Sequence, residues 1–221
     1  MQFSELQTEL QNRLSIVSTN TFWTLSMIKS WLNQANKWAC NYKFWPFTEK
    51  AKYTISRANA LYYDYPESFR SDSIRLLQIE QDDGRMADYK KIRYEDFVKY
   101  VLENPSGTDK IFSDFRRQYF INPKVAVANR EICVWGQEKP ALLVNDTDKT
   151  PFAEGDEAGE EAIIKRALMI ALQKASNYQK ATIERDEARL ILEDCWARIS
   201  EEQAGYQSKD REFFDVPDFF K

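Results

Sequence analysis

The strongest constraint on the fold is a long stretch without glycine or proline, Glu160 to Ala204. Glycine and proline are the residues that cost the most inside a helix, so this stretch predicts a helical segment. Its apolar residues recur at steps of three and four, which aligns them along one side of a helix. The aligned residues are Ile164, Leu168, Ala171, Ala175 and Tyr178, followed by Ala188, Leu192, Cys195 and Ile199. One unbroken helix would span roughly 65 Å at 1.5 Å per residue.

The same stretch also carries signals for a break. Polar residues crowd together between Ala181 and Glu187, where the apolar stripe thins. Ser176 and Gln179 have the spacing of a capping box, in which two side chains satisfy the first backbone amides of a helix. The stripe favours one continuous helix, whereas the polar interval and the cap favour two helices folded back as a hairpin. We expect the hairpin.

Two further helices are predicted near the N-terminus. Leucines spaced by four predict a helix over residues 4–14. A second apolar stripe begins after Asn20 or Thr21, either of which can cap a helix, and continues to about Tyr42. The Trp45-Pro46 pair ends this helix, because the residue before a proline avoids helical geometry.

The middle of the chain has the pattern of β-strands. Alternating or clustered apolar residues predict strands within residues 53–63, 74–80 and 85–92. Asp82-Asp83-Gly84 predicts the hairpin turn between the last two strands, because glycine supplies a positive φ. A short helix over residues 94–102 follows, and later strands are expected over residues 119–121, 125–128, 131–135 and 141–144.

Together these elements predict an α+β fold, with a helical bundle formed by N- and C-terminal helices and a β-rich insert between them. The expected segments are residues 1–48 for the N-terminal helices, 49–145 for the β-rich insert, 146–204 for an acidic loop and the C-terminal helices, and 205–221 for an extended aromatic tail.

The chain contains no histidine, and this excludes the commonest catalytic and metal sites. Without histidine there is no Ser-His or Cys-His nucleophile pair, no imidazole metal ligand and no usual general base near neutral pH. Cys40, Cys133 and Cys195 lie far apart and form no CxxC pair, so we expect reduced, buried thiols in a protein that folds in a cytosol. We therefore expect a protein that is not an enzyme and has no catalytic residue and no cofactor.

Charge and hydropathy narrow the range of partners. The net charge of -4 and the isoelectric point of about 5.2 argue against a protein that grips DNA phosphates. No stretch approaches the apolar length that crosses a bilayer, so no membrane partner is expected.

One acidic segment resembles a calcium loop. Asp146, Asp148, Thr150 and Glu157 fall at positions one, three, five and twelve of an EF-hand loop. The sixth position is Pro151, where such a loop needs glycine for its turn. An acidic, solvated loop is the better interpretation, and no metal site is expected.

Two groups of aromatic residues have the character of an interface. The sequence from Glu212 to Phe220 alternates phenylalanines with acids, and we expect it to dock on a partner. Its partner-docking residues are Phe213, Phe214, Val216, Phe219 and Phe220; the alternative is that they fold back onto the chain's own helices. The second group is expected to lie at a subunit interface and consists of Tyr62, Tyr63 and Tyr65. The alternative is that these tyrosines cover the core of the insert.

Three stretches together resemble the head–tail adaptor proteins of tailed bacteriophages. Trp31 to Ala35, continuing to Trp45-Pro46-Phe47, resembles the "W-[IL]-N-x-A-x-x-x-I … W-x-F" helix end of that family. Val144 to Pro151 is similar to its "D-T-D-x-x-P" lead into the C-terminal helices, and Ile163 to Leu172 is similar to the "I-I-x-x-A-L" start of those helices. The order of the stretches matches over most of the chain, although Asn122-Pro123 stands where the family usually has Gly-Pro.

The resemblance implies a structural, non-enzymatic protein of the virion neck that is assembled in the host cytoplasm. Such adaptors form a ring, usually a dodecamer, below the portal vertex of the capsid and provide the platform for the tail. The implied partners are the portal protein, the tail proteins and further copies of the chain, while DNA passes through the lumen without being read. An acidic wall suits that passage, because it repels phosphates.

Two other classes of function stay open. The first is a cytosolic helical module that binds other proteins as a monomer, without enzymatic activity. The second is a hydrolase that uses Asp or Glu, which has the least support because no metal set or glycine loop accompanies the acids.

Overall fold

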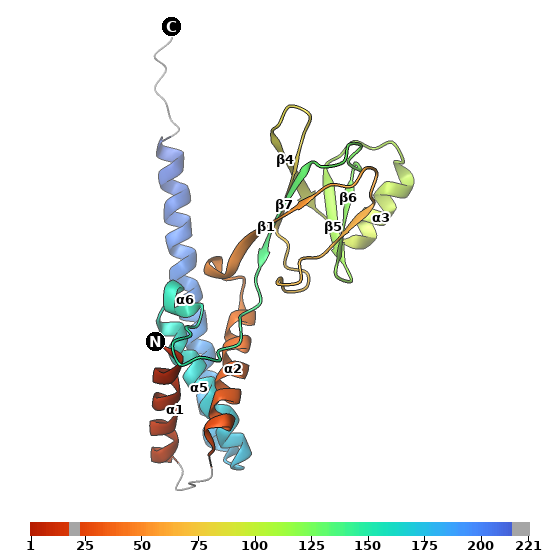
Figure 1. The fold of residues 1–221 in the computed structure, drawn as a ribbon. Coiled ribbons are helices and arrows are strands. Elements are labelled where there is room, and N and C mark those ends of the chain that lie inside the picture. The colour runs from red at the N-terminus through yellow and green to blue at the C-terminus, as the bar shows by residue number, and fades with distance from the viewer. Residues whose placement is uncertain (18–22, 214–221) are drawn as a thin grey trace. The chain divides into compact units, whose positions relative to one another are not determined.

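The computed structural model describes residues 1–17 and 23–213, with side chains described up to residue 202. This part of the chain is an α+β structure of six α-helices and a seven-stranded sheet. It divides into two compact units, one made of residues 1–47 with 140–221 and the other of residues 48–139 (Figure 1).

The first unit is helical. Its elements are α1 (Phe3–Val17), α2 (Leu25–Tyr42), α4 (Phe152–Gly155), α5 (Ala158–Lys174) and α6 (Tyr178–Phe213). A short 3-10 turn, η1 (Pro46–Thr48), spans the boundary between the units, and the second unit holds the sheet. Its elements are β1 (Glu49–Ile55), β2 (Tyr62–Asp64), β3 (Leu76–Glu80), β4 (Met86–Lys91), α3 (Tyr94–Glu103), β5 (Ile111–Phe115), β6 (Gln118–Asn122) and β7 (Glu131–Gln137).

The expected architecture, a bundle of terminal helices around a β-rich insert, is wrong. Helix α3 lies between β4 and β5, so helices and strands are interspersed along the chain. The reason is the direction of the strands. β4 and β5 pair in parallel, with Lys90 opposite Ile111, and a parallel pair needs a long crossover, usually a helix, where an antiparallel pair needs only a tight turn.

The sheet is mixed, with the strand order β1-β7-β3-β4-β5-β6-β2. All its other neighbouring pairs are antiparallel, and the β3–β4 hairpin turns at Gly84, whose φ is +77°. One face buries Leu77, Ile79, Ile132 and Val134 in the core of this unit. The strands expected over residues 125–128 and 141–144 are wrong, because both segments are irregular.

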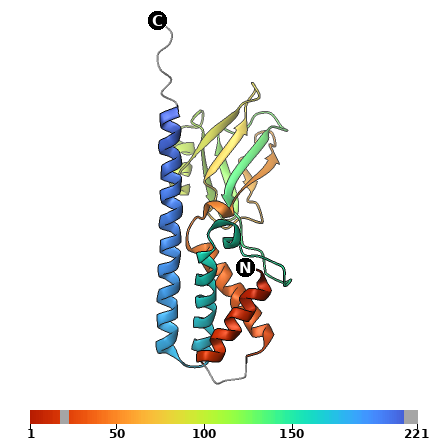
Figure 2. The same ribbon diagram turned by 90° about the vertical axis from the view of Figure 1, so that its left-hand side faces the viewer.

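The hairpin expected in the long helical stretch is confirmed. α5 and α6 are separate helices that lie side by side in Figure 1 and Figure 2. The capping box is wrong in detail, since Ser176 adopts a positive φ of 57° in the turn. Asn177 caps α6 instead, and its side-chain oxygen accepts the amide of Lys180 at 3.4 Å.

An aromatic cluster holds the end of α2 against the helices that follow residue 150. Trp45 is fully buried, and its indole nitrogen donates to the Ala39 carbonyl at 2.9 Å. The Trp45 ring centroid lies 5.2 Å from that of Phe152 and 5.7 Å from that of Trp196. A glycine at 159 is required here, because a Cβ would come within 2.0 Å of the Phe152 ring.

Candidate docking surfaces

Helix α6 projects beyond the core of its own unit. Among the side chains that the structure describes, Ile199 is the last one on α6 that packs on that core, next to Arg198, which pairs with Asp156 at 2.7 Å. The helix then continues to Phe213, about 20 Å further at 1.5 Å per residue (Figure 2). Phe213 is its last residue, and Phe214, Val216, Phe219 and Phe220 lie outside the described residues.

The three tyrosines predicted at a subunit interface differ in exposure. Tyr62 is 43% exposed, so its side chain is accessible to a neighbour. Tyr63 and Tyr65 are only 4% and 5% exposed, which corrects the expectation that they face solvent. Tyr63 stacks on Tyr119 with 5.5 Å between ring centroids, and the Tyr65 hydroxyl accepts the amide of Ser73 at 2.7 Å. Both side chains build the core of the sheet unit.

The second face of the sheet carries large, solvent-exposed apolar side chains on β1, β4 and β7, whereas α3 packs on the same face at β5 and β6 through Tyr94 and Phe97. Residues opposite one another in register point to the same side of a sheet, so Tyr53 shares this face with Cys133, and Ala51 shares it with Trp135 and Leu76. We call this surface the apolar sheet face. Its exposed large side chains are Tyr53 (65%), Ile55 (61%), Met86 (38%) and Trp135 (36%). Strand β1 lies at the sheet edge, so backbone groups border the same surface.

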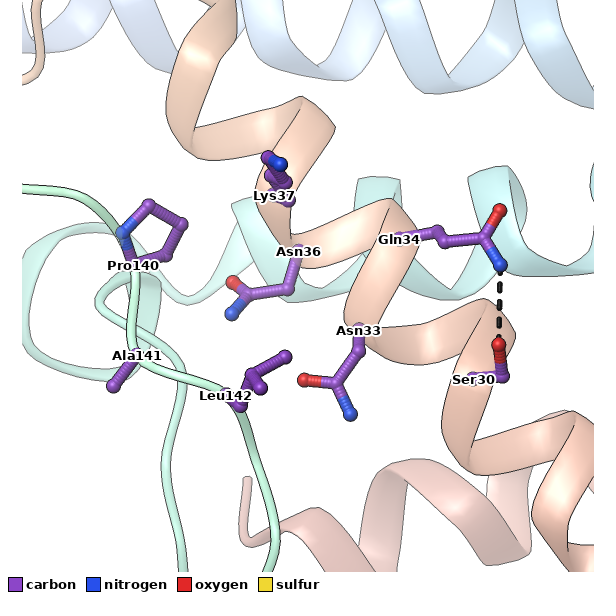
Figure 3. Close-up of a pocket in the computed structure, with 8 residues that line it drawn as sticks. All are labelled: Ser30, Asn33, Gln34, Asn36, Lys37, Pro140, Ala141 and Leu142. Carbon is purple, nitrogen blue, oxygen red and sulfur yellow. Dashed lines mark hydrogen bonds between the residues drawn. The ribbon is translucent and has the colours of Figure 1, made fainter. Parts of the chain in front are cut away.

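A small hollow lies between α2 and the segment that follows residue 139. Ser30, Asn33, Gln34, Asn36, Lys37, Pro140, Ala141 and Leu142 line it, with a volume of about 330 Å³ (Figure 3). Asn33 fixes its wall, because its side chain donates to the Leu143 carbonyl at 2.9 Å and accepts the Leu143 amide at 2.8 Å. Ser30 and Gln34 bond to each other at 3.1 Å. These contacts hold the chain in place, and Lys37 is the one charged side chain among the lining residues.

Arginines from α5 and α6 meet an aromatic pair from α2 on the helical unit. We call Arg166, Arg185, Arg189, Trp38 and Tyr42 the arginine patch. The Arg166 guanidinium lies 4.8 Å from the Trp38 ring centroid, and the Trp38 and Tyr42 centroids are 5.5 Å apart. Burial, with the positive charges of Arg189 and Arg185, lowers the pKa of Arg166.

Most of the acids around the arginine patch bind side chains other than its arginines. Glu184 and Glu187 hold Lys165 at 3.3 and 2.5 Å. Glu193 accepts the Tyr42 hydroxyl at 2.8 Å and pairs with Lys43 at 3.0 Å. Asp186 binds Arg185 at 2.8 Å, and neither Arg166 nor Arg189 forms an ion pair with any residue that the structure describes. The patch therefore carries unbalanced positive charge in a chain whose net charge is -4.

The calcium-like loop uses its acids to hold its own backbone. The Asp148 carboxylate accepts the amides of Val144 and Asn145 at 2.7 and 2.9 Å, and these bonds lower its pKa. Asp146 faces Lys29 at 3.6 Å. Among the side chains of residues 1–17 and 23–202, no group of three or more Cys, Asp or Glu is placed to hold a metal ion. None of the helices described has the length and apolar character that crossing a bilayer requires.

No model of a protein family matches the chain, and no curated protein matches its sequence.

Proposed function

We propose that the chain is a structural head–tail adaptor of a tailed bacteriophage. It forms a ring in the virion neck, binds the portal and tail proteins, and lets DNA pass through the ring without reading it. It is assembled in the host cytoplasm and acts without catalysis.

The supporting observation is that the three stretches behind the family resemblance pack together, although they are far apart in sequence. Asn33 of the first stretch binds the backbone of Leu143, immediately before the second stretch. Trp45 of the first stretch packs on Phe152, immediately after the second. Leu168 of the third stretch is buried in the core that α2 also enters. The three stretches that carry the resemblance therefore belong to one compact unit of the molecule, the helical unit.

The apolar sheet face suits assembly with neighbours. Aromatic and large apolar side chains are enriched at the centres of protein interfaces, and exposed apolar groups cluster there. A ring also needs two different complementary surfaces on each copy, because each copy meets its neighbours head to tail. The apolar sheet face is one candidate for such a surface.

Mass photometry of the purified chain, with and without purified portal particles, tests the proposal. We expect a ring, either free or on the portal, and we expect Tyr53→Asp to prevent its formation without lowering the melting temperature. Leu102→Asp is the control, because Leu102 is 76% exposed on α3 of the same unit and is not one of the exposed side chains that define the apolar sheet face.

The opposite outcome would overturn the proposal. A chain that stays monomeric and leaves portal particles unoccupied is not an adaptor. That result would favour the monomeric cytosolic binding module, with the apolar sheet face as its binding surface.

A further inference from the structure

We propose that the aromatic and acidic sequence from Glu212 to Phe220 of one copy docks on the arginine patch of a second copy. We call this sequence the docking motif. The inference rests on the proposed ring, since it names the surface that joins one copy to the next.

The chemistry of the two partners is complementary. The docking motif offers four phenylalanines together with the carboxylates of Glu212, Asp215 and Asp218. Arginine guanidinium groups bind carboxylates through paired hydrogen bonds, and they also stack on aromatic rings. Phenylalanine rings in turn fit the exposed parts of Trp38 and Tyr42, both of which are only partly buried.

The arginine patch is incomplete in the isolated chain. Arg166 and Arg189 form no ion pair with a described residue and Arg185 is paired with Asp186, while the other nearby acids hold Lys165, Tyr42 and Lys43. Like charges held together cost free energy, and an acidic partner relieves that cost. The patch thus has both the charge and the aromatic surface for such a partner.

Geometry makes the contact intermolecular. α6 runs without interruption from Arg189 to Phe213, a distance of about 36 Å along its axis. The sequence from Phe213 to Phe220 spans at most about 25 Å when fully extended. The docking motif therefore falls short of the patch on its own α6, and the patch that it can reach belongs to another copy.

The apolar sheet face is a poorer place for the docking motif. Register puts Glu131 beside Ile55 and Asp88 beside Gln78 on that face, and both acids are exposed. They repel the acids of the motif, whereas the arginines attract them.

Charge exchange in the full chain tests the docking. A patch variant carries Arg185→Glu with Arg189→Glu, a motif variant carries Asp215→Arg with Asp218→Arg, and an exchanged variant carries all four. We expect the patch variant and the motif variant to lose the oligomer seen by mass photometry, and the exchanged variant to regain it. We expect the patch variant to keep the melting temperature of the wild type, because Arg185 and Arg189 lie on the surface of α6. A control with Asp83→Arg and Arg85→Glu, at the exposed turn of the β3–β4 hairpin, should assemble like the wild type.

A labelled peptide of residues 212–220 gives a second measurement that needs no ring. It is offered to the full-length motif variant, whose own motif no longer competes. We expect binding by fluorescence anisotropy, and adding Arg185→Glu and Arg189→Glu should weaken it by at least about tenfold. Absence of binding, or binding that Tyr53→Asp abolishes and the arginine substitutions leave unchanged, would overturn the inference.

The two proposals fail in different ways. If the motif variant keeps the oligomer but loses the portal, the motif docks on the portal and this inference is wrong while the adaptor stands. If the peptide binds the patch but the chain never occupies portal particles, the adaptor is wrong and the docking contact stands.

Discussion

Two buried tyrosines of the sheet unit differ in whether the hydroxyl group has a hydrogen-bond partner. The Tyr65 hydroxyl accepts the amides of Ser73 and Ile74 at 2.7 and 3.0 Å. The Tyr119 hydroxyl is equally buried but has no hydrogen-bond partner among the described residues, and burial raises the pKa of Tyr119. The Tyr65 hydroxyl therefore stabilises the fold, whereas the Tyr119 hydroxyl loses its contact with water and gains no hydrogen bond in return.

Replacing each tyrosine by phenylalanine separates these cases. Tyr65→Phe should lower the free energy of unfolding by about 1–3 kcal/mol, because two buried amides lose their acceptor. Tyr119→Phe should leave it unchanged or raise it by up to about 1 kcal/mol, because only a group without a partner is removed. Urea unfolding measures both. Equal losses in the two variants would show that the Tyr119 hydroxyl has a partner in solution.

Cys195 is protected by its surroundings. Burial raises the pKa of its thiol to about 11, with the negative charge of Asp156 acting in the same direction. We expect native protein at pH 8 to resist iodoacetamide at this site, while urea-unfolded protein reacts. Mass spectrometry of the labelled peptide measures the difference, and equal rates would contradict it.

Because the pKa of Cys195 is raised in the folded state, the free energy of unfolding should fall as the pH rises. The neutral thiol is favoured in the folded state, so its contribution is fully present below the unfolded pKa of about 8.5. It is lost as the pH rises through about 11, the folded value for Cys195. Cys195→Ala should therefore flatten the fall in stability over that range.

The buried faces of α5 and α6 were predictable from the spacing of their apolar residues, but the position of the turn between these helices was not. Ile164, Leu168 and Ala171 are buried on α5, and Leu192 is buried on α6, as the apolar spacing indicates. Tyr178 belonged to the same predicted stripe but is 65% exposed. The turn at residues 175–177 ends one helix and starts another, so the rhythm of the first does not extend into the second.

Two leucines of α6 test the packing of this hairpin. Leu192 is fully buried, whereas Leu190 is 65% exposed on the same helix. Leu192→Asp should prevent a cooperative thermal transition, because it places a charge without a partner in the core. Leu190→Asp should shift the melting temperature little. A native-like transition in the first variant would mean that α6 does not pack on α5 in solution.

The sheet was less predictable, because strand order decides which face is buried. Alternation around Tyr63 and Tyr65 indicates a strand but not which side meets the core. The parallel pairing of β4 with β5 is a long-range choice that neither strand reveals in its own sequence. The apolar sheet face was missed for the same reason, since Tyr53 and Trp135 meet only through the pairing of β1 with β7.

The two sides of the proposed docking contact also differ in how far the sequence reveals them. The docking motif stands out in the sequence, because its phenylalanines and acids are contiguous. The arginine patch does not, because Trp38, Arg166 and Arg189 come from three helices and meet only after these pack. A contiguous binding segment is visible in sequence, whereas the surface that receives it is a property of the folded chain.

Truncation after Ser208 tests the motif in the complete protein. The cut removes the docking motif and the last turn of α6, beyond the core that ends near Ile199. We expect the melting temperature to stay the same, because Ile199 is the last described side chain of α6 in the core, and we expect ring assembly or portal binding to fail. A lower melting temperature with intact assembly would instead make this segment part of the chain's own core.

The continuity of α6 also makes it a spacer of defined length and phase. Its 36 residues span about 54 Å, so the position of whatever follows is set by residue count. Seven residues inserted after Glu202 would advance the docking motif by about 10 Å and turn it by only about 20°. Two inserted residues would advance it little but turn it by about 200°. In the proposed ring the first insertion widens the interval between neighbours and the second aims the motif away from them, so the number of copies that closes the ring depends on the length of one helix.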